Sequence, residues 1–421
     1  MKSLNLLTNQ EYRPKINIEI TGMGVVTSIG QGVTAFKEAL LSGKTQFGYL
    51  KRPGRESGKP FLGAELPEIE LKSLLPEQSR LLRTATWSSQ IATLAVSEAW
   101  QDAKIGNGKV DPERIGLVIG GSNLQQRYQQ QTWQRYQSRL EFLRPTYGLT
   151  VWDTDIMGLL SQCFQIQGEG YSVGGASASG AVAIIHAARQ ILMGITDISI
   201  AVGSLFDISA YECQGLMNLG AMGSDRFANC PNLACRPFDK EHDGFIYGEG
   251  CGALVLEKAE HAQQREALSH GKLIGWGLGL DGNRSPEPSQ KGEERAMNSS
   301  LVMANLKPEQ INYVNTHGTS SPLGDQTEVA ALKSVGLNHC LLNSTKSLTG
   351  HCLTAAGVVE AIATLLQIKF GFCHPTHNLI NPIDITLNWV KETTIQTNIK
   401  YAISNSFAFG GINAALLIEK R

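Results

Sequence analysis

The chain has almost no net charge, and its charged residues are few. Its 421 residues include 37 Lys and Arg against 38 Asp and Glu, and charged residues make up only 18%. This balance excludes the strongly basic surface that nucleic acid requires and the high net charge of a disordered chain. The sequence therefore predicts a folded protein without a nucleic-acid partner.

Long apolar runs and a disulfide framework are also missing. No stretch approaches the roughly 18 to 20 clean apolar residues of a membrane span, and even the apolar segment 181–193 contains His186 and Arg189. Residues Met1 to Asn17 lack the apolar core of a secretory signal. Eight cysteines are too few for a disulfide scaffold in a chain of this length. We expect a cytoplasmic protein without membrane association.

A metal site is not expected either. Cys230 and Cys235 flank a short loop and His242 follows nearby, but no second pair of ligands completes a typical set. The other cysteines are interpreted as small buried apolar residues.

Strands and helices alternate along the chain. With 44 glycines and 42% hydrophobic residues, the composition suits a tightly packed α/β protein. Apolar runs and periodicity predict the strands 18–26, 115–119, 198–202, 251–258, 273–280 and 413–420, and the helices 35–41, 181–193 and 350–368.

Two similar segments indicate an internal duplication. Cys251–Lys258 and Asn413–Lys420 both consist of small and apolar residues followed by Glu-Lys. We interpret residues 1–260 and 261–421 as two halves of one plan, each with a long apolar helix. Packing these helices between two sheets gives a five-layered α-β-α-β-α architecture and explains why they are apolar nearly all round.

One candidate reactive group lies at a turn rich in small residues. Ser177 is in the centre of Gly174–Gly180, immediately before the first long apolar helix. The start of a helix carries partial positive charge and unpaired N–H groups, a setting that suits nucleophiles and oxyanions.

Three motifs in the second half add further polar candidates. They are Val314–Glu328, which contains His317; Asn343–His351, which contains Lys346; and the glycine turn of Ser404–Asn413. Each alone has an ordinary explanation, as a hydrogen-bonded histidine, a solvated lysine or a packed turn. Their order and spacing after the turn at Ser177 make a chance combination implausible.

Together these motifs resemble those of β-ketoacyl-acyl-carrier-protein synthases of the elongating type. The resemblance covers nearly the whole chain, including Arg236–Lys240 and Asp243–Gly250. It implies the thiolase fold, a homodimer, and an acyl carrier protein as partner. The phosphopantetheine arm arrives on that carrier, so no cofactor of the protein's own is expected.

The resemblance also implies roles for individual residues. The acyl-accepting cysteine of the family falls on Ser177, and His317 and His351 match the histidines that bind the malonyl thioester carbonyl. Phe409 matches the gating phenylalanine, and its backbone N–H and that of Ser177 match the oxyanion hole. The remaining matches are Lys346, Asp325, Glu328 and Glu360 in a supporting polar network, Thr319 and Ser321 at the phosphopantetheine arm, and Phe407 and Gly410 at the substrate.

A serine in place of the cysteine alters the expected reaction. A hydroxyl is far less acidic than a thiol and needs a general base to become a nucleophile. Decarboxylation needs only hydrogen-bond donors at the thioester oxygen, where enolate charge develops. The chain thus resembles the Cys-to-Ser, ketosynthase-like malonyl-acyl-carrier-protein decarboxylases of polyketide β-branching (hydroxymethylglutaryl-synthase) cassettes, which produce acetyl-carrier protein.

Two alternatives remain open at this point. In the first, Ser177 accepts an acyl chain and the protein is an acyltransferase or a slow condensing ketosynthase. In the second, the chain is a catalytically silent partner subunit of a heterodimeric synthase, although His317, Lys346 and His351 argue against that.

Residues 124–144 depart from the regular pattern. They are rich in Gln, Tyr and Arg, and predict either a solvated helical insertion or a lid or docking surface for an acidic carrier domain.

Overall fold

A computed structural model describes residues 17–56, 58, 60–106, 108 and 110–421. The segment Met1 to Asn17, which is predicted to lack a secretory signal, lies outside these residues except for Asn17. Ten strands form one hydrogen-bonded path, and the short β2 (Gly30–Gln31) pairs with β1 beside it. In spatial order the ten are β12 (Leu341–Asn343), β11 (Tyr313–Asn315), β15 (Tyr401–Ala408), β16 (Ile412–Glu419), β10 (Gly271–Leu280), β1 (Ile18–Thr27), β9 (Gly250–Lys258), β7 (Ile198–Gly203), β5 (Ile115–Gly120) and β6 (Gly170–Val173).

The strand order is symmetric about its centre. Moving outward from the β1–β10 pair, β9 corresponds to β16, β7 to β15, β5 to β11 and β6 to β12. The two similar sequence segments are β9 and β16, and they hold equivalent places. This symmetry is what the predicted duplication would produce. Every predicted strand is present with its ends moved by at most two residues.

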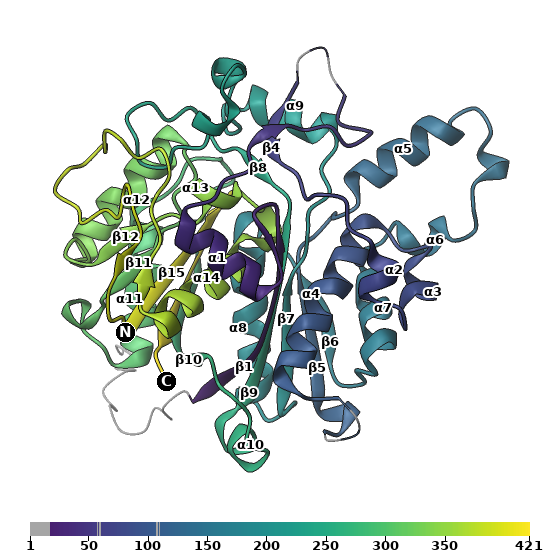
Figure 1. Cartoon of the computed structure of the whole chain (residues 1–421), viewed down its shortest axis with the longest axis horizontal. Helices are drawn as coiled ribbons and strands as arrows, with labels where there is room; N and C mark the ends of the chain where they lie inside the picture. Colours follow the sequence, from purple (N-terminus) through teal and green to yellow (C-terminus); the bar gives the residue numbers. More distant parts are fainter. Residues whose placement is uncertain (1–16, 57, 59, 107, 109) are drawn as a thin grey trace, which may run out of the picture.

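Helices form layers around and between the two halves of the sheet (Figure 1). The predicted five-layered thiolase fold is confirmed. One detail differs from two separate sheets: Ile18–Ile20 of β1 pair with Gly271–Leu273 of β10 and join the halves at one corner. The central layer is α8 (Ser179–Leu192) and α14 (Ala356–Phe370), and the outer layers are α4 (Trp87–Ala103) with α7 (Thr154–Phe164) and α11 (Gln290–Ala304) with α12 (Pro322–Val335).

The two central helices approach very closely at glycines. A Cβ atom on Gly180 of α8 would lie 2.8 Å from the backbone N of Val358, and one on Gly357 of α14 would lie 2.4 Å from the backbone N of Ala181. Only glycine leaves room for backbones at this distance. The crossing brings the N-terminal ends of both helices to the middle of the molecule.

The start of α14 was predicted six residues too early, at Gly350 instead of Ala356. Gly350 (φ 73°) and Leu353 (φ 47°) are left-handed, and the 3₁₀ turn η7 (Leu353–Ala355) precedes the helix. The first half repeats this feature with Ala176 (φ 44°) and the turn η3 (Ala176–Ala178) before α8. Left-handed non-glycine residues cost free energy and concentrate at functional sites.

The central layer also contains one apolar run as long as a membrane span, which the sequence analysis did not expect. Leu353–Phe370 has a mean hydropathy of 1.5 and is long enough to cross a membrane, yet 83% of it is buried inside the protein. Its composition follows from its place between two sheets, where it has almost no solvent-facing side.

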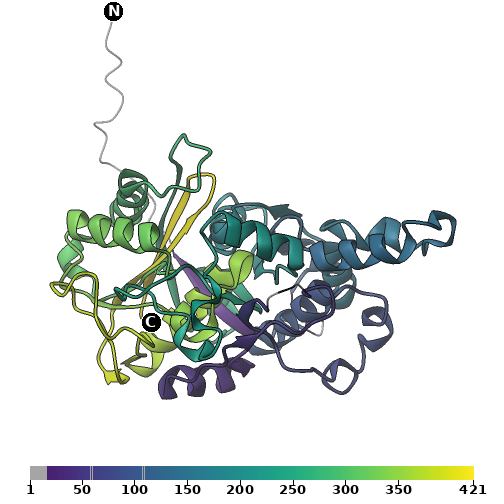
Figure 2. The same ribbon diagram turned by 90° about the horizontal axis from the view of Figure 1, so that it is seen from above.

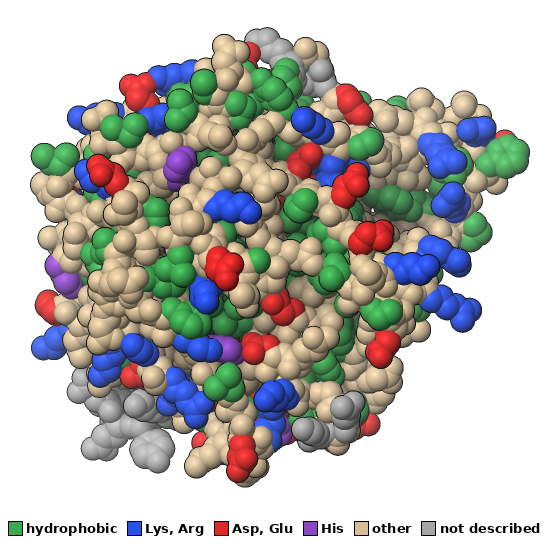
Figure 3. Space-filling model, in the orientation of Figure 1, with side chains coloured by type: hydrophobic (Ala, Val, Ile, Leu, Met, Phe, Trp, Pro, Cys, Tyr) green, Lys and Arg blue, Asp and Glu red, His purple; other side chains and the backbone are tan. Residues whose placement is uncertain are grey.

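A helical segment projects from the body beyond α4 and α7 (Figures 1 and 2). It consists of α5 (Gln126–Tyr136) and the turn η2 (Leu140–Phe142), so the predicted insertion is helical. Basic and hydrophobic side chains share its surface (Figure 3). Trp133 is 61% exposed and Phe142 68%, a feature that the Gln-rich composition did not suggest.

Candidate active site

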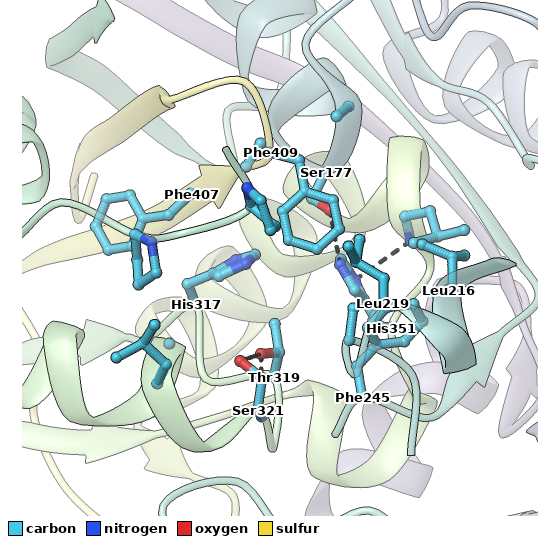
Figure 4. A pocket seen from close by; sticks show the side chains of 18 of the residues that line it. Ser177, Leu216, Leu219, Phe245, His317, Thr319, Ser321, His351, Phe407 and Phe409 are labelled. Carbon is cyan, nitrogen blue, oxygen red and sulfur yellow. Dashed lines mark hydrogen bonds between the residues drawn. The ribbon is translucent and has the colours of Figure 1, made fainter. Parts of the chain in front are cut away.

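Ser177 lies in the turn η3 at the N-terminal end of α8. The turn is held by a hydrogen bond from the backbone N–H of Gly175 to Ser179 Oγ at 2.9 Å. Ser177 is only partly buried, and its Oγ lies 2.8 Å from Nε2 of His351, which comes from the corresponding turn of the second half (Figure 4).

The other ring nitrogen of His351 determines which atom carries the proton. Nδ1 lies 3.3 Å from the backbone N–H of Leu353 and accepts its hydrogen bond. A neutral imidazole then carries its proton on Nε2. His351 therefore donates to Ser177 Oγ and has no free lone pair with which to remove the serine proton.

His317 is oriented in the same way by a lysine. Lys346 Nζ donates to Nδ1 of His317 at 3.2 Å and to the His317 carbonyl at 2.6 Å. Its third partner is Glu360 Oε1 at 2.5 Å, and both side chains of that ion pair are buried. An ammonium group has no lone pair, so Nδ1 must be the acceptor and Nε2 carries the proton. The two imidazole rings lie 5.6 Å apart, edge to face.

Both histidines are held in the neutral form. Burial, with the positive charge of Lys346 next, lowers the pKa of His317 and of His351 well below the ordinary 6.5. Burial also raises the pKa of Glu360 to about 7, against the opposing attraction of Lys346. The site thus presents two neutral N–H donors at physiological pH.

Two carboxylates fix the loop that carries His317. Glu328 accepts hydrogen bonds from the backbone N–H groups of His317 and Gly318, each at 2.8 Å. Asp325 Oδ1 accepts from the N–H groups of Thr319 (3.1 Å) and Ser320 (3.2 Å). These two members of the predicted network act on the backbone of the loop and do not contact the imidazole rings.

A cavity of about 750 Å³ opens onto Ser177, His317 and His351. Thr319 and Ser321 line it, and their hydroxyls are hydrogen-bonded to each other at 2.9 Å. Phe407 packs against the His317 ring, whereas Phe409 is 39% exposed and lies in front of Ser177 in Figure 4. Gly410 (φ 81°) continues the turn after Phe409, and a Cβ atom built on it would have no atom within 4 Å.

Some cavity residues were not anticipated from the sequence. Leu216 and Leu219 of the α9 region (α9, Ala210–Asn218) form part of the wall. Glu293 of α11 also lines it, is 1% exposed, and has an Oε2 atom without a hydrogen-bond partner among the described residues. A glutamate within Glu-Glu-Arg on a helix is usually a solvated residue, so no sequence signal marked this one.

The cysteines and histidine considered for a metal site are not brought together. Cys235 is buried and its Sγ donates to the Lys346 carbonyl, while Cys230 is exposed. His242 Nδ1 instead lies 3.0 Å from Asp325.

Comparison with known proteins agrees with this geometry. Residues 15–262 match the model of the β-ketoacyl synthase N-terminal domain, and residues 270–380 match that of the C-terminal domain. The chain is 47% identical to the polyketide biosynthesis malonyl-ACP decarboxylase PksF of Bacillus subtilis, over 96% of each chain.

Solved structures show the same fold. The ishigamide ketosynthase/chain length factor superposes with a TM-score of 0.87 at 26% identity, covering 97% of this chain and 100% of the other. A type II polyketide synthase ketosynthase solved in complex with its acyl-carrier protein gives a TM-score of 0.83 at 25% identity, with the same coverage. From its matching domains, its fold and its relatives, this chain belongs to the β-ketoacyl synthase family.

Proposed function

We propose that the protein decarboxylates malonyl-acyl-carrier protein to acetyl-acyl-carrier protein, without forming a carbon–carbon bond. The observation that carries this proposal is a site with two neutral N–H donors and a serine that has no base beside it. The name of the Bacillus subtilis relative, a malonyl-ACP decarboxylase of polyketide biosynthesis, supports it. A role in polyketide β-branching follows from the resemblance to that group of enzymes.

The two histidines carry the chemistry of CO₂ loss in this proposal. As the carboxylate leaves, negative charge develops on the thioester oxygen, and Nε2–H of His317 and of His351 donate to that oxygen. Donors that are already oriented stabilise this charge without reorganising, and one such donor is worth about 2.7–4 kcal/mol. Lys346 and Glu360 orient His317 and take no direct part.

Acyl transfer through Ser177 is the less favoured alternative. A serine nucleophile needs a base within hydrogen-bonding distance. The neighbouring nitrogen, His351 Nε2, is a donor because Nδ1 accepts from Leu353. A silent partner subunit is also disfavoured, because such a subunit needs no oriented Lys346–His317 pair.

The substrate arm is delivered by the partner. Thr319 and Ser321 line the cavity and are proposed to hold the phosphopantetheine of the carrier protein, with Phe407, Phe409 and Gly410 bordering the thioester. The backbone N–H groups of Ser177 and Phe409 are proposed as the oxyanion hole. The reaction requires no metal or organic cofactor, and we place it in the cytoplasm.

We also propose that the protein acts as a homodimer. The edge strand β6 is only half-buried and ends the sheet on the side of the projecting segment. Trp133, Leu140 and Phe142 expose apolar surface on that segment, and exposed clusters of this kind mark protein interfaces. A second copy that continues the sheet at β6 would cover them.

The test is intact-mass analysis of malonyl-loaded carrier protein after incubation with the enzyme. We expect a loss of CO₂ from the carrier and no mass gain on the enzyme. His317→Ala and His351→Ala should each slow the loss about 10²–10³-fold, the usual effect of removing one such donor. His339→Ala, a histidine outside the cavity, is the matched control. An acyl group that accumulates on the wild-type enzyme but not on Ser177→Ala would favour the acyltransferase instead.

A further inference from the structure

Loss of CO₂ leaves one step of the proposed reaction without an assigned residue. The resulting enolate must gain a proton on C2, the carbon next to the thioester carbonyl, before acetyl-carrier protein can leave. His317 and His351 direct their Nε2 protons at the thioester oxygen, and their Nδ1 atoms accept hydrogen bonds. Neither histidine therefore has a second proton to give.

Ser177 has a hydroxyl proton that is not in use. Its Oγ accepts from His351 Nε2 at 2.8 Å. Among the described residues no acceptor takes the hydroxyl hydrogen, and the partly exposed side chain borders the cavity. An O–H group whose oxygen accepts a hydrogen bond becomes a better donor, because linked hydrogen bonds polarise one another.

The duplicated half offers an internal comparison. Thr354 occupies in η7 the position of Ser177 in η3, and each follows a left-handed residue at the start of a central helix. The Thr354 hydroxyl, however, donates to the carbonyl of Ser204 at 2.7 Å. Of these two equivalent hydroxyls, only that of Ser177 remains available to a bound substrate.

Ser177 lies close to the reacting carbon because both its hydroxyl and the thioester oxygen are near Nε2 of His351. A thioester oxygen that accepts from His351 Nε2 lies within hydrogen-bonding distance of the same nitrogen that Ser177 Oγ contacts. C2 is two bonds away from that oxygen. Among the described residues, Ser177 has the hydroxyl for which a hydrogen bond to His351 Nε2 is found; the Thr319 hydroxyl donates to Ser321 instead.

We propose that the Ser177 hydroxyl delivers the proton to C2 of the enolate, an inference that rests on the proposed decarboxylation. The Ser177 O–H bond breaks as the new C–H bond forms. As C2 is protonated, the enolate oxygen becomes a neutral carbonyl, and the Nε2–H of His351 turns from it to the serine alkoxide. The N-terminal end of α8 also stabilises this alkoxide, which then takes a proton from water. The net reaction consumes one proton and converts the malonyl thioester carboxylate to an acetyl thioester and CO₂.

The experiment follows the origin of the added hydrogen. Malonyl-loaded carrier protein is turned over in an equal mixture of H₂O and D₂O, and the H-to-D ratio of the acetyl group is read from the acetyl-phosphopantetheine ion. Wild type is compared with Ser177→Ala and Ser177→Cys. At equilibrium with mixed water, thiols contain less deuterium than hydroxyls do. The H-to-D ratio of the acetyl group therefore depends on which kind of group donates the proton. If Ser177 had only a structural role, its substitution would not change this ratio.

We expect Ser177→Ala to give an H-to-D ratio different from wild type, because water then protonates the enolate in place of the hydroxyl. Ser177→Cys should shift the ratio toward protium. Equal ratios in all three proteins would overturn the assignment. If wild type itself releases no CO₂, the proposed function fails, and that result is distinct from the others.

Discussion

The chemistry of this site depends on which ring nitrogen of each histidine carries the proton. Lys346 and the backbone N–H of Leu353 occupy the Nδ1 atoms of the two histidines, so both rings present donors to the cavity. In the proposed reaction, serine in place of cysteine removes the covalent step while leaving the donors in position.

The depressed histidine pKa values predict the pH profile. Acetyl-carrier formation should stay constant as pH falls through 6.5, the ordinary pKa of histidine, and decline only in more acidic solution. Lys346→Met removes one positive charge that disfavours imidazolium and should move this decline upward by about one pH unit. The measurement is the initial rate against pH, with Lys333→Met, a surface lysine paired to Asp384, as control. A wild-type decline centred on 6.5 would contradict the assigned protonation states.

Most residues of the site could be identified from local sequence, because His317, Lys346 and His351 occur in compact motifs at strand ends and helix starts. Their roles depended on information that the sequence does not carry. Tertiary geometry determines which histidine atom accepts the hydrogen bond from Lys346. Glu293 likewise reaches the cavity only because α11 packs with that face inward.

At the scale of elements, the crossing of α8 and α14 sets the distance between Ser177 and His351. Gly357→Ala should destabilise the fold by about 1–3 kcal/mol, the usual cost of overpacking, because its Cβ would collide with the backbone of Ala181. Chemical denaturation measures the change. The matched control is Gly158→Ala in α7, where nothing lies within 4 Å of the added Cβ, so the helix should gain about 0.5–1 kcal/mol. Equal effects of the two changes would refute the close crossing.

Glu293 on helix α11 leads to a prediction about how the stability of the protein changes with pH. Burial, followed by the charges of Glu328 and Asp281, raises the pKa of Glu293 well above the ordinary 4.5. The folded state therefore keeps a proton that the unfolded state loses, and stability falls as pH rises above 4.5. Glu293→Gln removes this loss, so its stability relative to wild type should increase by about 1.4 kcal/mol per pH unit until the raised pKa is reached. A pH-independent difference in unfolding free energy would show that Glu293 is ionised in the folded protein.

Most of the strands and helices could be predicted from the sequence, because buried strands appear there as short apolar runs between glycines. The start of α14 was not predicted. The left-handed turn at Leu353 is followed by a long-range hydrogen bond from Thr354 to the carbonyl of Ser204, a contact that the local sequence does not reveal.

On the scale of the whole molecule, the projecting segment predicts the oligomeric state. Trp133→Asp combined with Phe142→Asp should reduce the mass from twice 45.6 kDa to 45.6 kDa, because each subunit would bury two charges in the proposed interface. Light scattering coupled to gel filtration measures it, with Ile385→Asp, which is 83% exposed elsewhere, as control. An unchanged mass would place the dimer contact away from this segment.

The position of β1 also has a consequence for how the chain is made. This strand leaves the ribosome long before its partners β9 and β10, which begin only at Gly250 and Gly271. Translation adds roughly 5–20 residues per second, so β1 remains without these two partner strands for on the order of tens of seconds. Until then the nascent protein carries β1 without these two partners, and the edges of this mostly apolar strand are a substrate for chaperones and a site for aggregation when chaperones are scarce. A gene fragment that stops before Gly250 should for that reason yield insoluble product, even though it encodes Ser177 and the whole of α8.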